Sequence, residues 1–134
     1  GLYMICTLSK HEAEKQGYTD SLMLDHEGYV AEATGANIFF KDKDGTLHTP
    51  IPDSFLDGIT RRTVIEIANS MNIKVNERKI KPDELKNFVG CFLTGTAAEV
   101  TPVSQIDKFN YKVCNTIIRL SESYQQTVRK KKAA

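Results

Sequence analysis

The chain has 134 residues, of which 40% are hydrophobic and 26% are charged. This composition is typical of a folded globular protein and excludes a chain that is disordered over most of its length. Eighteen basic and seventeen acidic residues leave a net charge of +1, so we expect no general attraction to nucleic acid or to an anionic membrane. The length suits one domain, or a part of a larger protein.

Residues that form disulfides or bind metals are few and scattered. Cys6, Cys91 and Cys114 show no paired spacing, so we expect free thiols and a cytoplasmic protein. The histidines follow no ligand motif, so we expect no metal site and place each of them on the surface or in a loop. These histidines are His11, His26 and His48. No apolar run approaches the roughly 20 residues that cross a bilayer, so we expect no membrane span.

The first predicted element is a helix over residues 2–16. Its apolar residues recur at intervals near those of a helical face, and Gly17 stands where a glycine often ends a helix. We therefore expect the chain to open with an amphipathic helix.

Two antiparallel hairpins are predicted next. The first joins residues 22–24 to 29–31 through a polar turn, and the second joins 37–40 to 47–49 through Asp44-Gly45. Asp-Gly favours a tight turn because glycine adopts positive φ values at little cost. A small antiparallel sheet is therefore expected in the first third of the chain.

A helix is predicted after the loop over residues 50–58, which prolines and glycine interrupt. Thr60 is placed to cap this helix, and apolar residues over 64–71 form its buried stripe. The remaining predicted elements are a strand over 73–77, a short helix opened by Pro82, a buried strand over 91–93, a small-residue loop over 95–98 and an amphipathic helix from Asn115. The basic run over residues 129–132 is predicted to be a solvated tail.

Two segments have the chemistry of a phosphate site. Gly58-Ile59-Thr60 enters a helix, and Gly95-Thr96-Ala97 leaves a strand. Free backbone amides at a helix N-terminus favour an anion, and a threonine hydroxyl adds a donor. On its own, each segment is more simply a helix cap or a tight connection. Glu32, at the end of an apolar strand, is on its own more simply a surface carboxylate.

Taken in order, four segments resemble one known family. They are GYVAE at 28–32, GANIF at 35–39, LDGITR at 56–61 and FLTGTAAEVTP at 92–102. The series closely resembles the C-terminal domain of fold-type IV pyridoxal phosphate enzymes, and the branched-chain amino acid aminotransferases most of all. The resemblance runs from about residue 1 to about residue 107. It implies that residues 1–134 form a single α/β (α+β) domain, a pseudo-barrel of antiparallel strands with surrounding helices.

The resemblance implies a role for three residues around the ring of pyridoxal 5'-phosphate. Glu32 would pair with the pyridine nitrogen and keep it protonated. Tyr3 would hydrogen-bond the phenolic oxygen of the cofactor, and Leu56 would pack on a face of the ring. By this resemblance, Glu32 would be the residue that keeps the ring electron-poor.

The resemblance also implies a phosphate clamp and a substrate contact. Ile59 and Thr60 would bind the phosphate at a helix start, with Thr96 as the second arm of the clamp. Thr96 and Ala97 would receive the carboxylate of the substrate. The cofactor is therefore expected between two segments that lie far apart in the sequence.

The resemblance places two further parts before the chain. The Schiff-base lysine of the family would lie two residues before Gly1, and the small N-terminal domain would lie further upstream. We therefore expect no catalytic residue in this chain, no transaminase activity by the chain alone, and weak or absent cofactor binding.

The reaction implied for the parent protein transfers the amino group of leucine, isoleucine or valine to 2-oxoglutarate. The expected partners are a small amino acid, a 2-oxo acid and a second copy of the protein, with no nucleic acid and no membrane. Two other parents of the same fold stay open, D-amino-acid aminotransferase and aminodeoxychorismate lyase. A noncatalytic remnant that serves as an association module stays open as well.

Overall fold

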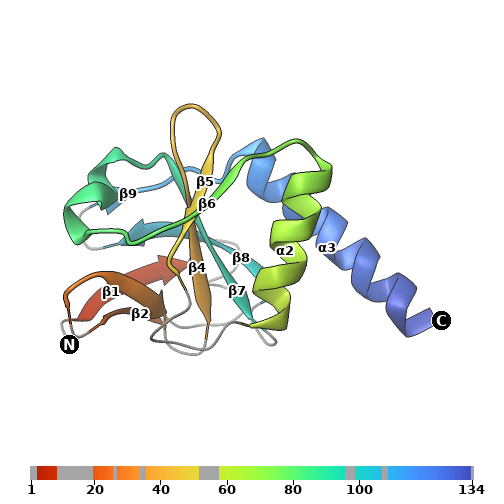
Figure 1. The fold of residues 1–134 in the computed structure, drawn as a ribbon, viewed down its shortest axis with the longest axis horizontal. Coiled ribbons are helices and arrows are strands. Elements are labelled where there is room, and N and C mark those ends of the chain that lie inside the picture. Colours follow the sequence, from red (N-terminus) through yellow and green to blue (C-terminus); the bar gives the residue numbers. More distant parts are fainter. Residues whose placement is uncertain are drawn as a thin grey trace.

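The computed structural model describes residues 3–8, 20–25, 27–33, 36–51, 58–95, 99–106 and 109–133. Within these ranges strands dominate and three helical elements accompany them (Figure 1). In chain order the elements are β1 (Tyr3–Leu8), β2 (Asp20–Leu24), β3 (Val30–Ala33), β4 (Asn37–Lys41), β5 (Leu47–Thr49), α2 (Ile59–Ser70), β6 (Val75–Glu77), η1 (Pro82–Asn87), β7 (Gly90–Gly95), β8 (Glu99–Ile106), β9 (Phe109–Asn110) and α3 (Asn115–Ala133). No helix in these ranges is both long and apolar enough to cross a membrane.

The described strands form one sheet that curls into a pseudo-barrel. Their order is β3-β2-β1-β8-β7-β4-β5-β6, with β9 beside β8. Strands β5 and β6 are parallel, with α2 between them in the chain, and the other described pairs are antiparallel. The two ends of the order meet where the Val30 amide of β3 donates to the Ile80 carbonyl beyond β6, at 2.8 Å. The expected antiparallel pseudo-barrel with surrounding helices is confirmed.

The central strands bury both of their faces. Ile38 and Phe40 of β4 belong to an apolar cluster on one face of the sheet, which also contains Leu85 of η1. Phe39 and Phe92 belong to a second cluster, which α2 and α3 cover. These two helices lie side by side on one flank of the sheet (Figure 1). Burial on both faces explains why β4 and β7 are apolar without alternation.

The N-terminal segment is a strand, so the helix predicted over residues 2–16 is wrong for Tyr3–Leu8. Strand β1 pairs with β2 on one side and with β8 on the other. A strand with neighbours on both sides carries apolar residues at successive positions, and periodicity alone does not distinguish it from a buried helix. Ile5 and Thr7 are β-branched and favour a strand. Residues 9–16 lie outside the described ranges.

Most other predicted elements are confirmed. The two hairpins are β2–β3 and β4–β5, and Gly45 has a φ of +90° in the second turn. Helix α2, strand β6, helix η1, strand β7 and helix α3 lie where the sequence placed them. The basic run over 129–132, expected as a tail, continues helix α3, and Arg129 and Lys130 are exposed.

Strand β8 is missing from the sequence prediction because Pro102 lies in its middle, and proline is rare inside a sheet. Up to Pro102 the strand pairs with β7, and from Val103 onward it pairs with β1. Pro102, which has no amide proton to donate, therefore lies where β8 stops pairing with β7 and begins to pair with β1. The sheet accommodates a proline here because the strand changes its neighbour at this residue.

We expect Phe92→Ala to lower the free energy of unfolding by about 3–5 kcal/mol, because it leaves a cavity between the sheet and the helices. Phe92 is fully buried, and its ring stacks on that of its register partner Phe39 with centroids 4.9 Å apart. Urea denaturation measures the loss. Ile118→Ala on α3, where the side chain is 43% exposed, is the control and is expected to cost less than about 1 kcal/mol. Equal losses in the two variants would contradict this packing.

Candidate functional site

Helix α2 begins against the first residue of β4. The Gly58 amide donates to Asn37 Oδ1 at 3.3 Å. A Cβ on Gly58 would lie 2.8 Å from the same oxygen, so only glycine allows this approach without a shift. No hydrogen bond from a described side chain caps the helix, and its first turn has no acidic residue. The amides and the dipole of this helix start therefore favour an anion.

Thr60 lies inside the first turn of α2, so its predicted role as the N-cap is wrong. Gly58 occupies the cap position, with φ of −66° and ψ of 148°. A residue two positions further into the helix cannot cap it. Thr60 is buried, and its Oγ1 lies 3.4 Å from the Tyr124 hydroxyl of α3. Ile59, the first helical residue, is 82% exposed.

A buried hydroxyl lies at the neighbouring strand end. Thr94 is fully buried in β7, and its Oγ1 has no hydrogen-bond partner among the described residues. Thr94 pairs with Asn37 of β4, and alternation along β7 puts it on the same face as Phe92, toward α2 and α3. A buried hydroxyl without a partner costs about 1–3 kcal/mol. An unsatisfied hydroxyl near an uncapped helix start fits a phosphate group, which offers several acceptor oxygens.

Arg61 links α2 to strand β6. Its side chain is 1% exposed, and Nη2 donates to Glu77 Oε1 at 2.6 Å and to the Pro50 carbonyl at 3.1 Å. The guanidinium group of Arg61, in the first turn of α2, therefore binds strand β6 and the residue that follows β5.

Two residues predicted to contact the cofactor ring lie in one row of the sheet. Tyr3 of β1 pairs with Met23 of β2, and Met23 pairs with Glu32 of β3. Adjacent strands are spaced by just under 5 Å, so the backbones of Tyr3 and Glu32 are about 10 Å apart on either side of Met23. The predicted site residues outside the described ranges are Leu56, Thr96 and Ala97.

Sequence reasoning missed three polar residues near the start of α2. They are Asn37, Thr94 and Tyr124. A usable signal exists for two of them, because Asn37 and Thr94 are buried polar residues that directly adjoin the apolar runs of β4 and β7. Tyr124 carries no such signal, because an aromatic residue on the inner face of an amphipathic helix is usually part of the core.

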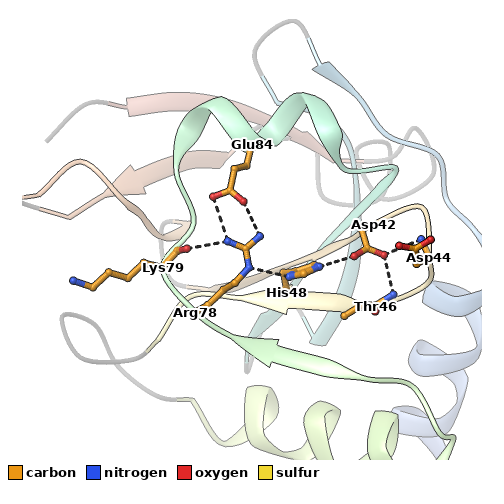
Figure 2. Close-up of polar contacts among 7 residues, drawn as sticks. All are labelled: Asp42, Asp44, Thr46, His48, Arg78, Lys79 and Glu84. Carbon is orange, nitrogen blue, oxygen red and sulfur yellow. Dashed lines mark hydrogen bonds and ion pairs between the residues drawn. The ribbon is translucent and has the colours of Figure 1, made fainter.

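A second polar cluster ties the β4–β5 hairpin to η1 (Figure 2). His48 Nε2 lies 2.7 Å from Asp42 Oδ2, and Arg78 Nε donates to His48 Nδ1 at 3.1 Å. Because Nδ1 accepts this bond, the proton of the neutral ring is on Nε2 and is donated to Asp42. Arg78 also makes a paired contact with Glu84, at 2.7 and 3.2 Å. The cluster is satisfied internally, in contrast to Thr94.

This cluster corrects the expectation that every histidine lies on the surface or in a loop. His48 is 8% exposed, in strand β5, and its ring lies 5.4 Å from that of Phe88. His11 and His26 lie outside the described residues. In the described part of the chain, no three His, Cys, Asp or Glu residues are grouped to hold a metal. Cys114 is a free thiol, and Cys91 is buried.

The cluster lowers the pKa of two carboxyl groups. Burial tends to raise the pKa of Asp42, but hydrogen bonds from His48 and from the amides of Thr46 and Asp44 outweigh it and hold the pKa below its ordinary 3.8. Hydrogen bonds from Arg78 lower the pKa of Glu84 below its ordinary 4.5, against an opposing effect of burial. Both groups are therefore stabilised as carboxylates.

Comparison with known sequences finds one family and many relatives. The profile of the family described as amino-transferase class IV matches residues 1–106. A probable branched-chain-amino-acid aminotransferase of Rickettsia felis is 48% identical over 131 residues, which are 95% of this chain and 45% of the relative. The branched-chain-amino-acid aminotransferase of Pseudomonas aeruginosa is 44% identical over 107 residues, which are 80% of this chain and 34% of the relative.

Solved structures show the same likeness. The branched-chain aminotransferase of the thermophilic archaeon Thermoproteus uzoniensis, solved with norvaline, superposes with a TM-score of 0.77 at 39% identity, over 87% of this chain and 39% of that one. The chain spans less than half the length of the curated relatives it matches.

We expect the Arg78–Glu84 pair to make stability depend on pH. A carboxylate whose folded pKa is depressed contributes stability above its unfolded pKa and loses it as the pH falls through the folded value. The unfolding free energy should therefore decline as the pH falls below about 4.5, the ordinary pKa of Glu84.

The variant that tests this is Glu84→Gln. It should lose about 0.5–1 kcal/mol at pH 7, a modest amount because the pair is partly exposed and screened by solvent. Its decline below pH 4.5 should also be shallower than that of the wild type. Urea denaturation at several pH values measures both effects, with the exposed Glu66→Gln as the control. Identical pH profiles for the wild type and Glu84→Gln would contradict the assignment.

Proposed function

Because the chain belongs to the class IV aminotransferase family, whose members depend on pyridoxal phosphate, we propose that it is the C-terminal, cofactor-binding domain of a branched-chain amino acid aminotransferase. The observation that carries the proposal is 48% identity, over 95% of the chain, to a probable enzyme of that name. The Schiff-base lysine and the small domain belong to a preceding part of the protein in this proposal. The whole protein would transfer the amino group of leucine, isoleucine or valine to 2-oxoglutarate.

The ligands of another solved relative support this substrate class. A branched-chain amino acid aminotransferase that is 41% identical to this chain, with a TM-score of 0.78, has been solved with N-(5'-phosphopyridoxyl)-L-glutamate and with 4-methylvaleric acid. The first ligand joins the cofactor to glutamate, and the second has the branched carbon skeleton of leucine. We extend to this protein a site that alternately accepts a branched-chain and an acidic substrate, in a cytoplasmic homo-oligomer.

In the proposed site, the start of α2 holds the cofactor phosphate. The amides of Ile59 and Thr60 would donate to the anion along the helix axis, and Gly58 brings this helix start close to β4. The unsatisfied Thr94 hydroxyl lies at the adjacent strand end. Thr96 would add the second arm of the clamp, and Ala97 would join it in receiving the substrate carboxylate.

The row across β1, β2 and β3 holds the ring in this proposal, with Leu56 packing on one face of it. Pyridoxal phosphate, when bound, accepts the electron pair released as the proton leaves the substrate Cα. The Glu32 carboxylate would hold the proton on the ring nitrogen and so keep the ring electron-poor. The Tyr3 hydroxyl would donate a hydrogen bond to the phenolic oxygen of the ring and fix its orientation. These roles suit positions two strands apart on either side of Met23.

We expect the isolated 134-residue chain to show no transamination, because it has no lysine in the position that bonds the cofactor and moves the Cα proton. Glutamate formation from leucine and 2-oxoglutarate with added pyridoxal phosphate is the assay. A longer protein that includes the upstream lysine and small domain should be active, and D-alanine and aminodeoxychorismate serve as substrates of the alternative parents. Turnover by the isolated chain that Glu32→Ala abolishes would contradict the expectation.

In that longer protein, Glu32→Gln should keep the cofactor bound but lower kcat at least about a hundredfold. Glutamine preserves the size of the side chain and removes its charge, so the transition state for proton removal loses more stabilisation than the ground state. A hundredfold loss corresponds to about 2.7 kcal/mol. The cofactor absorbance measures occupancy, and steady-state kinetics measure kcat. A variant with bound cofactor and an unchanged kcat would remove Glu32 from this role.

A further inference from the structure

Helix α3 contacts both segments that flank the proposed phosphate site. Its residue Tyr124 meets Thr60 in the first turn of α2. The next residue, Gln125, donates through Nε2 to Glu99 Oε2 at the start of β8. Thr60 and Glu99 are 39 residues apart in the sequence (99 − 60), and two adjacent residues of one helix reach both of them.

Either hydroxyl can be the donor in the contact between Tyr124 and Thr60. A threonine hydroxyl has one proton to donate and two lone pairs. If Tyr124 donates its proton to Thr60 Oγ1, the proton of Thr60 stays available to an acceptor in front of the helix. The separation of 3.4 Å is longer than an ordinary bond between two hydroxyls, so the effect of Tyr124 on the orientation of Thr60 is modest.

The contact between Gln125 and the side chain of Glu99 lies at a strained backbone position. Glu99 has a φ of +52°, in the left-handed region that non-glycine residues seldom adopt. It pairs with Gly95, the last residue of β7. A backbone held in this region costs free energy and persists where neighbouring contacts enforce it, often at ligand sites. The side chain of Gln125 provides one such neighbouring contact, through the Glu99 carboxylate.

From these two contacts we infer that Tyr124 and Gln125 are positioning residues for the cofactor phosphate. This inference rests on the proposed function, because the phosphate is that of pyridoxal phosphate. Tyr124 orients the Thr60 hydroxyl, and Gln125 holds the β7 and β8 ends at a fixed distance from the start of α2. Helix α3, which lies beyond the family match over residues 1–106, thereby contributes to cofactor affinity.

The test compares pyridoxamine 5'-phosphate with pyridoxamine, which lacks the phosphate, on the full protein that contains this chain. Equilibrium dialysis gives the Kd of each compound. Tyr124→Phe and Gln125→Met each remove one polar contact and keep the size of the side chain. Each should raise the Kd of pyridoxamine 5'-phosphate about threefold to tenfold, the range of one modest hydrogen bond, and leave the Kd of pyridoxamine within about twofold.

Two controls separate positioning from general stability. Gln126→Ala changes an exposed residue of the same helix. Tyr111→Phe removes a buried hydroxyl that donates to the Leu85 carbonyl at 2.8 Å, in the other apolar cluster. Both should leave the ratio of the two Kd values unchanged. The Tyr124→Phe effect should also vanish when Thr60 is replaced by Val, because Tyr124 acts through that hydroxyl.

The outcomes distinguish this inference from the proposed function. A wild-type protein that binds pyridoxamine 5'-phosphate no more tightly than pyridoxamine overturns the phosphate site, and the inference with it. A wild-type protein that prefers the phosphorylated compound, with the same preference in Tyr124→Phe and Gln125→Met, overturns the inference alone. Equal losses for both compounds also overturn it, because they indicate a structural role.

Discussion

The close approach of Gly58 to Asn37 is the contact on which the proposed site depends. It sets the start of α2 against the start of β4, at a distance that a Cβ would prevent. Strand β4 is itself fixed, because Ile38, Phe39 and Phe40 are fully buried in clusters on both faces of the sheet. A helix start held in this way has amides that need an acceptor, and Thr94 adds a buried hydroxyl with the same need.

Strand β8 determines how the two parts of the proposed site lie relative to each other. Its first half pairs with β7, beside Thr94, and its second half pairs with β1, whose Tyr3 begins the row that ends at Glu32. The phosphate end and the ring end of the site are therefore built on one continuous strand. Helix α3 contacts the start of that strand through Gln125, so α3 also contributes to the position of the phosphate end of the site.

Local signals in the sequence are sufficient for the hairpins, α2, η1 and α3, because turns, caps and amphipathic periods act within a few residues. They fail for β1, where a strand with two neighbours has an apolar pattern that also suits a helix, and for β8, whose Pro102 is tolerated only at a change of partner. The family motifs predicted Ile59 and Thr60 as site residues. The contacts of Asn37 and Tyr124 could not be predicted, since they join residues that the chain keeps far apart.

The central claim is that the phosphate of the cofactor binds at the start of α2. A crystal structure of the full protein with pyridoxamine 5'-phosphate tests it most directly. The account predicts phosphate oxygens within hydrogen-bond distance of the Ile59 and Thr60 amides, about 2.7–3.2 Å. A phosphate bound elsewhere, for example among the basic residues over 129–132 at the end of α3, with the start of α2 facing only solvent, would contradict it.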